Sequence, residues 1–305
     1  MFVKPVPIPL HPTGEAVLDA LSDLTLSALA AAVADQAAGV TAELAVGLDV
    51  SGADARSPLE RVALLDAARR EAEIFGDNYV RCEYLLFGAL RMLGDEDRLY
   101  RAREDFQILT ADRLFDAYAA LTPHPRPAGA PRPSLVMLTG LPGTGKSTLA
   151  EALARALPAS VFSMDWQLGT LVRFGVLRPD NTGPMSELML AAAAARQLQL
   201  GLPVVVDATG HRRKDRERLA DLAHSLDTRF VGVECLCSDE EVQRARLAGR
   251  DRGIPGWKST VSWEHVKRMQ GLWEPWEELH LALDSAVLTA ADSLQQVLEV
   301  IANGE

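Results

Sequence analysis

The sequence predicts an α/β protein in which a parallel-sheet domain follows a separate all-helical domain. Residues 13–121 carry alanine, leucine and charged residues at helical spacing. A proline-rich segment interrupts the chain at residues 122–133, and short β-branched runs then alternate with helical patterns. This alternation is typical of a parallel sheet with helices on both faces, for which we expect five strands in the order 2-3-1-4-5.

Residues 1–121 are predicted to form the helical domain, as in the stretch LERVALLDAARREAEIFG (residues 59–76). A weak internal repeat, VTAELAVGL and VRCEYLLFGAL, places Glu43 and Glu83 at helix starts, where the helix dipole favours an acid. The second copy and its flanks, residues 57–120, resemble the N-terminal domain of Clp-type unfoldases. That resemblance implies a docking site for a protein partner. The alternative is a helical cap that packs on the second domain.

Residues 122–133 read TPHPRPAGAPRP and contain five prolines. Proline has no amide donor and stiffens the chain toward an extended conformation. We therefore predict an interdomain linker here.

Residues 134–305 are predicted to form the sheet domain. Expected strands are SLVMLTG (134–140), SVFSMD (160–165), LPVVVDATG (202–210), RFVGVECL (229–236) and a fifth near Leu279–Leu283. Expected helices cover residues 145–157, 186–200, 214–226, 238–249 and 291–302.

Composition narrows the function classes. The net charge is -11, and an acidic surface repels polyanions, so extended nucleic acid is a disfavoured partner. Cys82, Cys235 and Cys237 form neither a disulfide framework nor a metal-ligand spacing, which predicts packing residues in a reducing cytoplasm. No uncharged apolar stretch reaches 18 residues, so no transmembrane helix is expected.

The stretch GLPGTGKST has the G-x-x-x-x-G-K-S pattern of a phosphate-binding loop, between a predicted strand and a predicted helix. Lys146 is expected to reach the β- and γ-phosphates, and the Ser147 hydroxyl to bind Mg²⁺. The loop therefore predicts ATP and Mg²⁺ as ligands. The expected nucleotide-binding residues of the loop are Gly140, Pro142, Gly143, Thr144, Gly145, Lys146, Ser147 and Thr148.

Two carboxylates favour phosphoryl transfer over ATP-driven motion. The third strand ends in Asp207, whose carboxylate is a candidate ligand for Mg²⁺ and a candidate contact for the substrate. The next residue is Ala208, whereas a motor ATPase usually has a Glu there that activates water. The second strand ends in Asp165, and ligands lie at the carboxyl ends of parallel strands. Asp165 is therefore the candidate base for an acceptor hydroxyl. The alternative is that Asp165 caps the next helix.

Arginines in two segments are candidates for binding the negatively charged phosphates. The run HRRKDRER (residues 211–218) places Arg212 and Arg213 nearest the strand end, although most such runs are solvated helix faces. Further on, Arg246 and Arg250 lie four residues apart in a segment flanked by glycines. This predicts a lid whose arginines bind the nucleotide and offset charge on the transferred phosphoryl group.

Four tryptophans follow the predicted lid, at positions 257, 263, 273 and 276. Trp257, directly after a turn containing proline and glycine, is the candidate for stacking on the acceptor. The alternative is that the tryptophans anchor the lid and the last helix to the sheet.

Residues 134–290 together resemble the P-loop kinases that include polynucleotide 5′-kinases, zeta-type toxins and chloramphenicol phosphotransferase. The resemblance implies that Asp165, Lys146 and Arg250 are catalytic, and that Asp207 and Arg213 lie at the acceptor. One position departs from the pattern. Polynucleotide kinases have an Arg one turn after the catalytic Asp, and here that position is Leu168.

We therefore expect an ATP-dependent kinase that phosphorylates a hydroxyl of a small-molecule or nucleoside-type acceptor. Three alternatives remain open at this point: a polynucleotide 5′-hydroxyl kinase, a zeta-toxin-like nucleotide-sugar kinase, and a regulatory P-loop ATPase whose helical domain recruits a protein.

Overall fold

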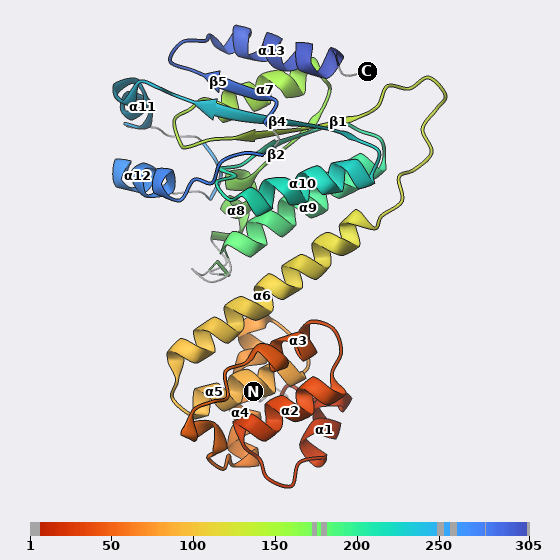
Figure 1. The fold of residues 1–305 in the computed structure, drawn as a ribbon, viewed down its shortest axis with the longest axis vertical. Coiled ribbons are helices and arrows are strands. Elements are labelled where there is room, and N and C mark those ends of the chain that lie inside the picture. The colour runs from red at the N-terminus through yellow and green to blue at the C-terminus, as the bar shows by residue number, and fades with distance from the viewer. Residues whose placement is uncertain are drawn as a thin grey trace, which may run out of the picture. The chain divides into compact units, whose positions relative to one another are not determined.

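The computed structural model describes residues 7–172, 176–177, 182–248, 253–256, 261–277 and 279–303. The chain divides into two compact units, Met1–Arg113 (unit 1) and Leu114–Glu305 (unit 2). Figure 1 shows the helices of unit 1 and the sheet of unit 2. No described helix is long and apolar enough to cross a membrane.

Unit 1 is helical over its described residues, as predicted. Its elements are α1 (Pro12–Asp19), α2 (Leu26–Gln36), α3 (Val40–Gly47), the 3₁₀ turn η1 (Ala53–Arg56), α4 (Arg61–Phe75), α5 (Cys82–Met92) and most of α6 (Glu96–Ala119).

Helix α5 is central to the core of unit 1, because all of its residues from Cys82 to Leu90 are buried. A Cβ at Gly88 would lie 2.8 Å from the backbone nitrogen of Ala68 in α4, so the glycine permits this close helix pair. The two copies of the internal repeat also meet, since the Thr41 hydroxyl of α3 donates to Glu83 of α5 at 3.0 Å. Burial raises the pKa of Glu83.

The boundary between the units differs from the predicted linker, because it falls inside α6 at Arg113/Leu114. Helix α6 ends at Ala119, before the prolines that cannot continue it. The proline-rich segment is tied to unit 2. The amide of His124 donates to the Gln199 carbonyl at 2.8 Å, and Arg126 and Arg132 pair with Asp227.

Unit 2 contains a five-stranded, all-parallel sheet of order β2-β3-β1-β4-β5, which confirms the predicted P-loop kinase fold. The strands are β1 (Ser134–Thr139), β2 (Ser160–Ser163), β3 (Val204–Asp207), β4 (Arg229–Leu236) and β5 (Leu281–Asp284). The helices are α7 (Lys146–Ala156), α8 (Met164–Val172), α9 (Thr182–Gln199), α10 (Arg213–Ser225), α11 (Glu240–Leu247), α12 (Trp263–Gly271) and α13 (Ala290–Ala302).

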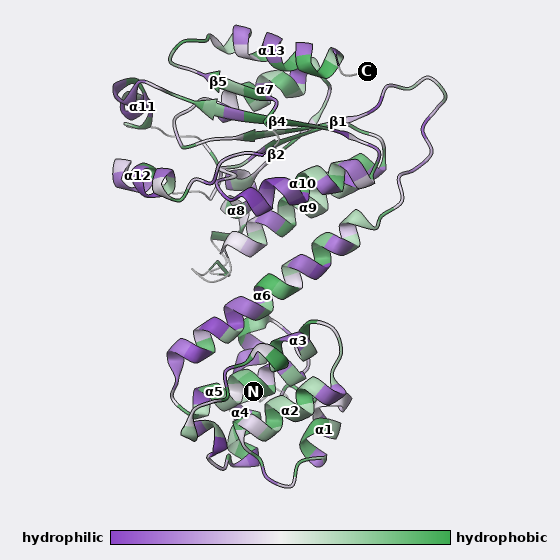
Figure 2. Ribbon diagram, in the orientation of Figure 1, coloured by the Kyte–Doolittle hydropathy of each residue, from purple (hydrophilic) through white to green (hydrophobic). Residues whose placement is uncertain are grey.

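Helices cover both faces of the sheet (Figure 1). Alternate residues of β1 separate the two cores, because Met137 packs with α9 and α10, whereas Val136 and Leu138 pack with α7 and α13. All residues of β1 and β3 are buried, as expected for strands covered on both faces. Figure 2 shows apolar residues along these central strands and polar residues along much of α10 and α11.

The chain order places β1 in the middle of the sheet, with β3 on one side and β4 on the other. Ligands bind at such a switch point, outside the carboxyl ends of the strands. The segment after β1, residues 140–145, therefore occupies the position where the fold favours a ligand.

Candidate active site

The loop from Gly140 to Gly145 turns sharply between β1 and α7. Gly140, Gly143 and Gly145 have φ angles of 140°, 88° and 91°, a region that favours glycine. A Cβ at Gly140 would also lie 2.2 Å from the Cys235 carbonyl oxygen. Helix α7 begins at Lys146, so its N-terminal amides and its positive dipole end open onto the loop. This is the local geometry of an anion cradle.

Hydrogen bonds hold this loop on both sides. The Gly140 amide donates to the Thr209 carbonyl at 3.1 Å, and the Gln243 side-chain amide of α11 donates to the Pro142 carbonyl at 2.7 Å. Within the loop, Thr144 Oγ1 and Lys146 Nζ donate to the Leu141 carbonyl at 2.8 Å and 3.0 Å. The loop is therefore preorganised, which lowers the ordering cost of binding phosphates.

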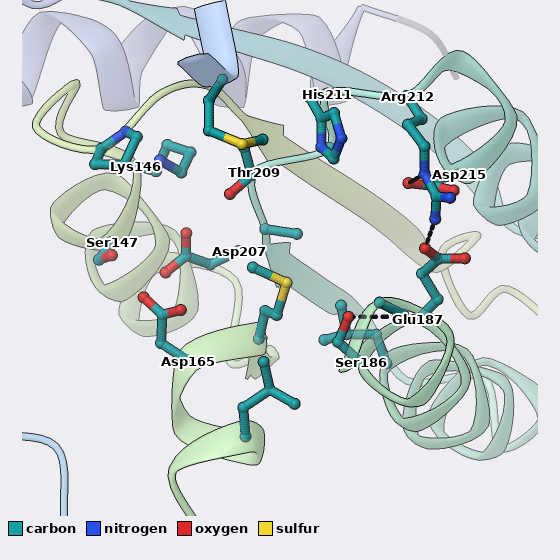
Figure 3. Close-up of a pocket in the computed structure, with 18 of the residues that line it drawn as sticks. Lys146, Ser147, Asp165, Ser186, Glu187, Asp207, Thr209, His211, Arg212 and Asp215 are labelled. Atoms are coloured by element: carbon teal, nitrogen blue, oxygen red, sulfur yellow. Dashed lines mark hydrogen bonds and ion pairs between the residues drawn. The ribbon is translucent and has the colours of Figure 1, made fainter. Parts of the chain in front are cut away.

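A cavity of about 520 Å³ opens beside the loop. Lys146 and Ser147 from α7, Asp207 from the end of β3 and Asp165 from α8 line it together (Figure 3). The strand register explains this meeting, because Ser163, Asp207 and Leu138 lie side by side at the ends of β2, β3 and β1. Helix α8 begins at Met164, so Asp165 lies in its first turn, two residues past the strand, and is not the residue that caps the helix.

The other end of the cavity holds an ionic cluster, defined as Arg212, Glu187 and Asp215 (Figure 3). Arg212 pairs with Glu187 of α9 and with Asp215 of α10, the latter at 3.0 Å. Burial raises the pKa of Asp215, and the neighbouring Arg212 opposes that shift. Arg218 adds a second cation to Glu187 at 3.5 Å. The positive charge of Arg212 is thus largely balanced by protein carboxylates.

Apolar side chains form much of the wall between these two ends. They include Met137, Met164, Leu168, Leu190, Leu219, Leu247, Val261, Met269 and Phe115. Leu168, the position that departs from the polynucleotide kinase pattern, is 3% exposed.

A second cavity of about 390 Å³ lies against the other side of the loop. Thr148 of α7 and Arg246 of α11 line it, together with Ser285 after β5. Arg246 donates to the Ser285 hydroxyl at 2.7 Å and to the Gly143 carbonyl at 3.3 Å. The loop therefore has one cavity on each side, with Gly143 and Gly145 shared by both.

The buried Arg216 holds two segments together beside the first cavity. It is 2% exposed and donates to the carbonyls of Gly210, Glu274 and Pro275, each at 2.7 Å. Its guanidinium stacks over Trp276 at 4.7 Å from the ring centroid and lies 5.8 Å from that of Trp273. Trp273 and Trp276 thus join the segment after α12 to Arg216 of α10, which bonds to the cavity-lining turn at Gly210. The anchoring of the lid and the last helix to the sheet stays a prediction.

The structure brings most of the predicted site residues together, but not all. Arg213 does not line the cavity: its guanidinium pairs with Glu277, and its amide donates to Glu274 at 2.5 Å. It faces away because it begins α10, one residue past the cavity-lining Arg212. Arg250 and Trp257 lie outside the described residues.

Sequence reasoning missed several residues that line or support the site. Asp215 lies within a run interpreted as basic, Glu187 lies in an alanine-rich helix, and Gln243 gave no motif signal. Helix α12, which contributes His265 and Met269 to the cavity, was not predicted. Desolvation by burial, followed by the charge of Arg268, lowers the pKa of His265.

The residues at the loop fit a bound Mg²⁺. No group of three or more His, Cys, Asp or Glu side chains among the described residues forms a metal cage. Mg²⁺ needs no such cage beside a nucleotide, because it usually takes one or two protein oxygens and completes its shell with phosphates and water. The Ser147 hydroxyl and the buried Asp207 carboxylate line the same cavity and offer those oxygens.

The sheet domain is similar to known proteins. A family model described as an AAA domain matches residues 135–276. No curated protein sequence matches the chain. The narrower resemblances to polynucleotide kinases, zeta-type toxins and the Clp N-terminal domain stay predictions.

Several solved structures are similar to the chain. A gluconokinase from Sinorhizobium meliloti 1021 has 22% identity and a TM-score of 0.42, over 57% of this chain and 94% of that one. The APS kinase CysC of Mycobacterium tuberculosis, in complex with AMPPNP and APS, has 19% identity and a TM-score of 0.39, over 57% and 99%. Kti12 of Chaetomium thermophilum, in complex with ADP-AlF3, has 18% identity and a TM-score of 0.40, over 55% and 96%.

Proposed function

We propose that unit 2 is an ATP-dependent phosphotransferase that moves the γ-phosphoryl group to a hydroxyl of a small acceptor. One observation carries the proposal: the phosphate loop has a separate cavity on each side, and in the larger one the Asp165 carboxylate lies at the same end as Lys146 and Ser147. A donor and an acceptor each need such a space. A hydrolase needs only the first, because its second reactant is water.

The second cavity suits the nucleoside part of ATP. From there the phosphates follow the loop amides toward Lys146 at the start of α7, where the helix dipole and the ammonium group favour negative charge. Arg246, held by Ser285 and the Gly143 carbonyl, lies at the junction. The pattern G-x-x-x-x-G-K-S is thus placed to hold the donor phosphates.

Acceptor activation is assigned to Asp165. The acceptor hydroxyl oxygen bonds to the γ-phosphorus, the bond from that phosphorus to the β–γ bridging oxygen breaks, and ADP leaves. The hydroxyl proton passes to the Asp165 carboxylate. Ser147 and Asp207 would hold Mg²⁺, which would supply positive charge to the donor phosphates. Lys146 supplies further positive charge there, with Arg250 as the predicted lid contribution.

Water activation is less well provided for. The residue after Asp207 is Ala208, which lines the cavity and is 8% exposed. The other cavity carboxylates among the described residues, Glu187 and Asp215, are paired with Arg212 at the far end. These positions favour a kinase over the regulatory ATPase alternative.

The test is transfer of label from γ-labelled ATP to nucleosides, sugars, amino sugars and oligonucleotides, with products identified by mass. We expect a phosphorylated organic product. Release of inorganic phosphate alone, at a rate unchanged by every acceptor, would refute the proposal.

Unit 1 is proposed to bind a protein partner. The proposal rests on the resemblance of residues 57–120 to the N-terminal domain of Clp-type unfoldases, and unit 1 has a hydrophobic core of its own. Removal of residues 1–113 is expected to abolish partner binding and to leave nucleotide binding by unit 2 intact. Loss of nucleotide binding in that truncation would contradict separate roles for the units.

A further inference from the structure

We propose that the acceptor is a hydroxyl compound without phosphate or carboxylate groups, and that Glu187 and Asp215 determine this specificity by occupying Arg212. The proposal rests on the proposed function, since it describes the acceptor of that same site. It concerns the end of the cavity that lies away from the phosphate loop.

The charges at that end are already paired. Arg212 is the one arginine among the described residues that line the cavity. Its guanidinium contacts carboxylates from two different helices, Glu187 of α9 and Asp215 of α10. The two carboxylates take the Nε and Nη2 groups of Arg212. An anionic acceptor that approached Arg212 would therefore lie beside two negative charges, which repel it.

The carboxylates instead suit hydrogen-bond donors. Asp215 Oδ1 is buried and has no hydrogen-bond partner within the described part of the chain, although its side chain belongs to the cavity lining. A buried acceptor atom without a donor costs about 1–3 kcal/mol, which a ligand hydroxyl or amine would recover. The side chains of Glu187 and Asp215 are 14% and 13% exposed and both line the cavity.

Ser186, Thr209, His211 and His265 also line the cavity. Part of the wall is apolar, because Leu168, Leu190 and Leu219 line it and are each at most 4% exposed. They offer no donor to a phosphate. An acceptor with an apolar body, with donors at the end opposite its reactive hydroxyl, fits this distribution. Nucleosides and amino sugars have such donors and carry no anionic group.

An anion titration tests the specificity role without knowledge of the natural acceptor. The full-length protein is saturated with AMPPNP and Mg²⁺, so that the phosphate loop is filled, and inorganic phosphate is titrated by calorimetry. The wild type is compared with the double variant Glu187→Gln/Asp215→Asn, which keeps side-chain size but frees Arg212. Glu151→Gln, in an exposed pair on α7, is the matched control.

We expect phosphate to bind at least about tenfold more tightly to the double variant than to the wild type or the control. Adding Arg212→Gln to the double variant is expected to remove the gain. Equal phosphate affinity in the wild type and the double variant overturns the proposal, as does a gain that persists without Arg212. Circular dichroism and the melting temperature establish that each variant is folded.

Matched acceptors give the second arm. Adenosine is compared with adenosine 3′-monophosphate, and glucosamine with gluconate, using label transfer from γ-labelled ATP. Faster transfer to the anionic member of either pair overturns the proposed acceptor class. The failure of the proposed function has a different signature, because the wild type would then bind AMPPNP poorly or transfer label to none of the four compounds.

Discussion

Replacement of Arg216 by methionine tests whether this buried cation fixes the edge of the larger cavity. The substitution keeps an unbranched apolar side chain beside Trp276 but removes donors to three carbonyl groups, those of Gly210, Glu274 and Pro275. Leaving a buried acceptor unsatisfied costs about 1–3 kcal/mol each, so the gross loss is about 3–9 kcal/mol.

Part of that loss is offset, because burial of the guanidinium is itself unfavourable. Desolvation lowers the pKa of Arg216, which means that burial disfavours the charged form of the guanidinium. Breaking a buried charged group away from its partners typically leaves a net loss of about 3–5 kcal/mol. We take a loss of about 3 kcal/mol, the lower end of that range. A loss of 1 kcal/mol lowers the melting temperature of a unit of this size by about 2–4 °C, so the melting temperature of unit 2 is expected to fall by about 6–12 °C.

Tryptophan fluorescence measures this change selectively, because all five tryptophans of the chain lie in unit 2. The matched control is Arg155→Met. Arg155 is 77% exposed and pairs with Glu151 at 3.6 Å, so its replacement should shift the melting temperature by less than about 2 °C. If Arg216→Met melted within that margin of the control, the anchoring role assigned to Arg216 would be wrong.

Two further predictions concern the loop and the ionic cluster. Gly140→Ala is expected to weaken ATP binding by about 5- to 100-fold in calorimetry, because its Cβ would lie 2.2 Å from the Cys235 carbonyl and its φ of 140° strains any other residue by about 1–3 kcal/mol. Gly271→Ala, with no atom within 4 Å of the added Cβ, is the control, and equal affinities would contradict the preorganised loop. Asp215→Asn is expected to become more stable relative to the wild type as the pH rises above 3.8, the ordinary pKa of an Asp carboxyl. The folded pKa of Asp215 is raised by burial, so the folded wild type holds the proton more tightly and loses stability as the pH passes through its folded pKa. Chemical denaturation between about pH 3 and 7 measures the difference, and the opposite slope would refute the burial argument.

Sequence patterns predicted the sheet well, because strands buried on both faces, such as β1 and β3, carry short apolar runs. Residues 229–236 match β4 at both ends, and Asp207 ends β3 as expected. The boundary between the units was harder to predict. Prolines at residues 122–133 mark where α6 must end, but they do not determine which unit the last turns of α6 join.

The donor half of the candidate site was predictable, since a local motif encodes it. The acceptor half was not, because it depends on pairing between distant helices. Glu187 and Arg212 are 25 residues apart and meet only when α9 and α10 pack on the same face of the sheet. Without that contact, Arg212 and Arg213 look equivalent in sequence, yet only the first lines the cavity.

The proposed function requires Asp165 to accept a proton from a hydroxyl acceptor while the phosphate loop holds ATP. The most direct measurement compares the wild type with Asp165→Asn for label transfer from γ-labelled ATP to the acceptor panel, and for ATP affinity by calorimetry. We expect transfer to fall by about 10²–10⁴-fold, the usual contribution of a general base, while ATP affinity changes by less than about threefold. Full transfer activity in Asp165→Asn, or label that appears only as inorganic phosphate in the wild type, would contradict it.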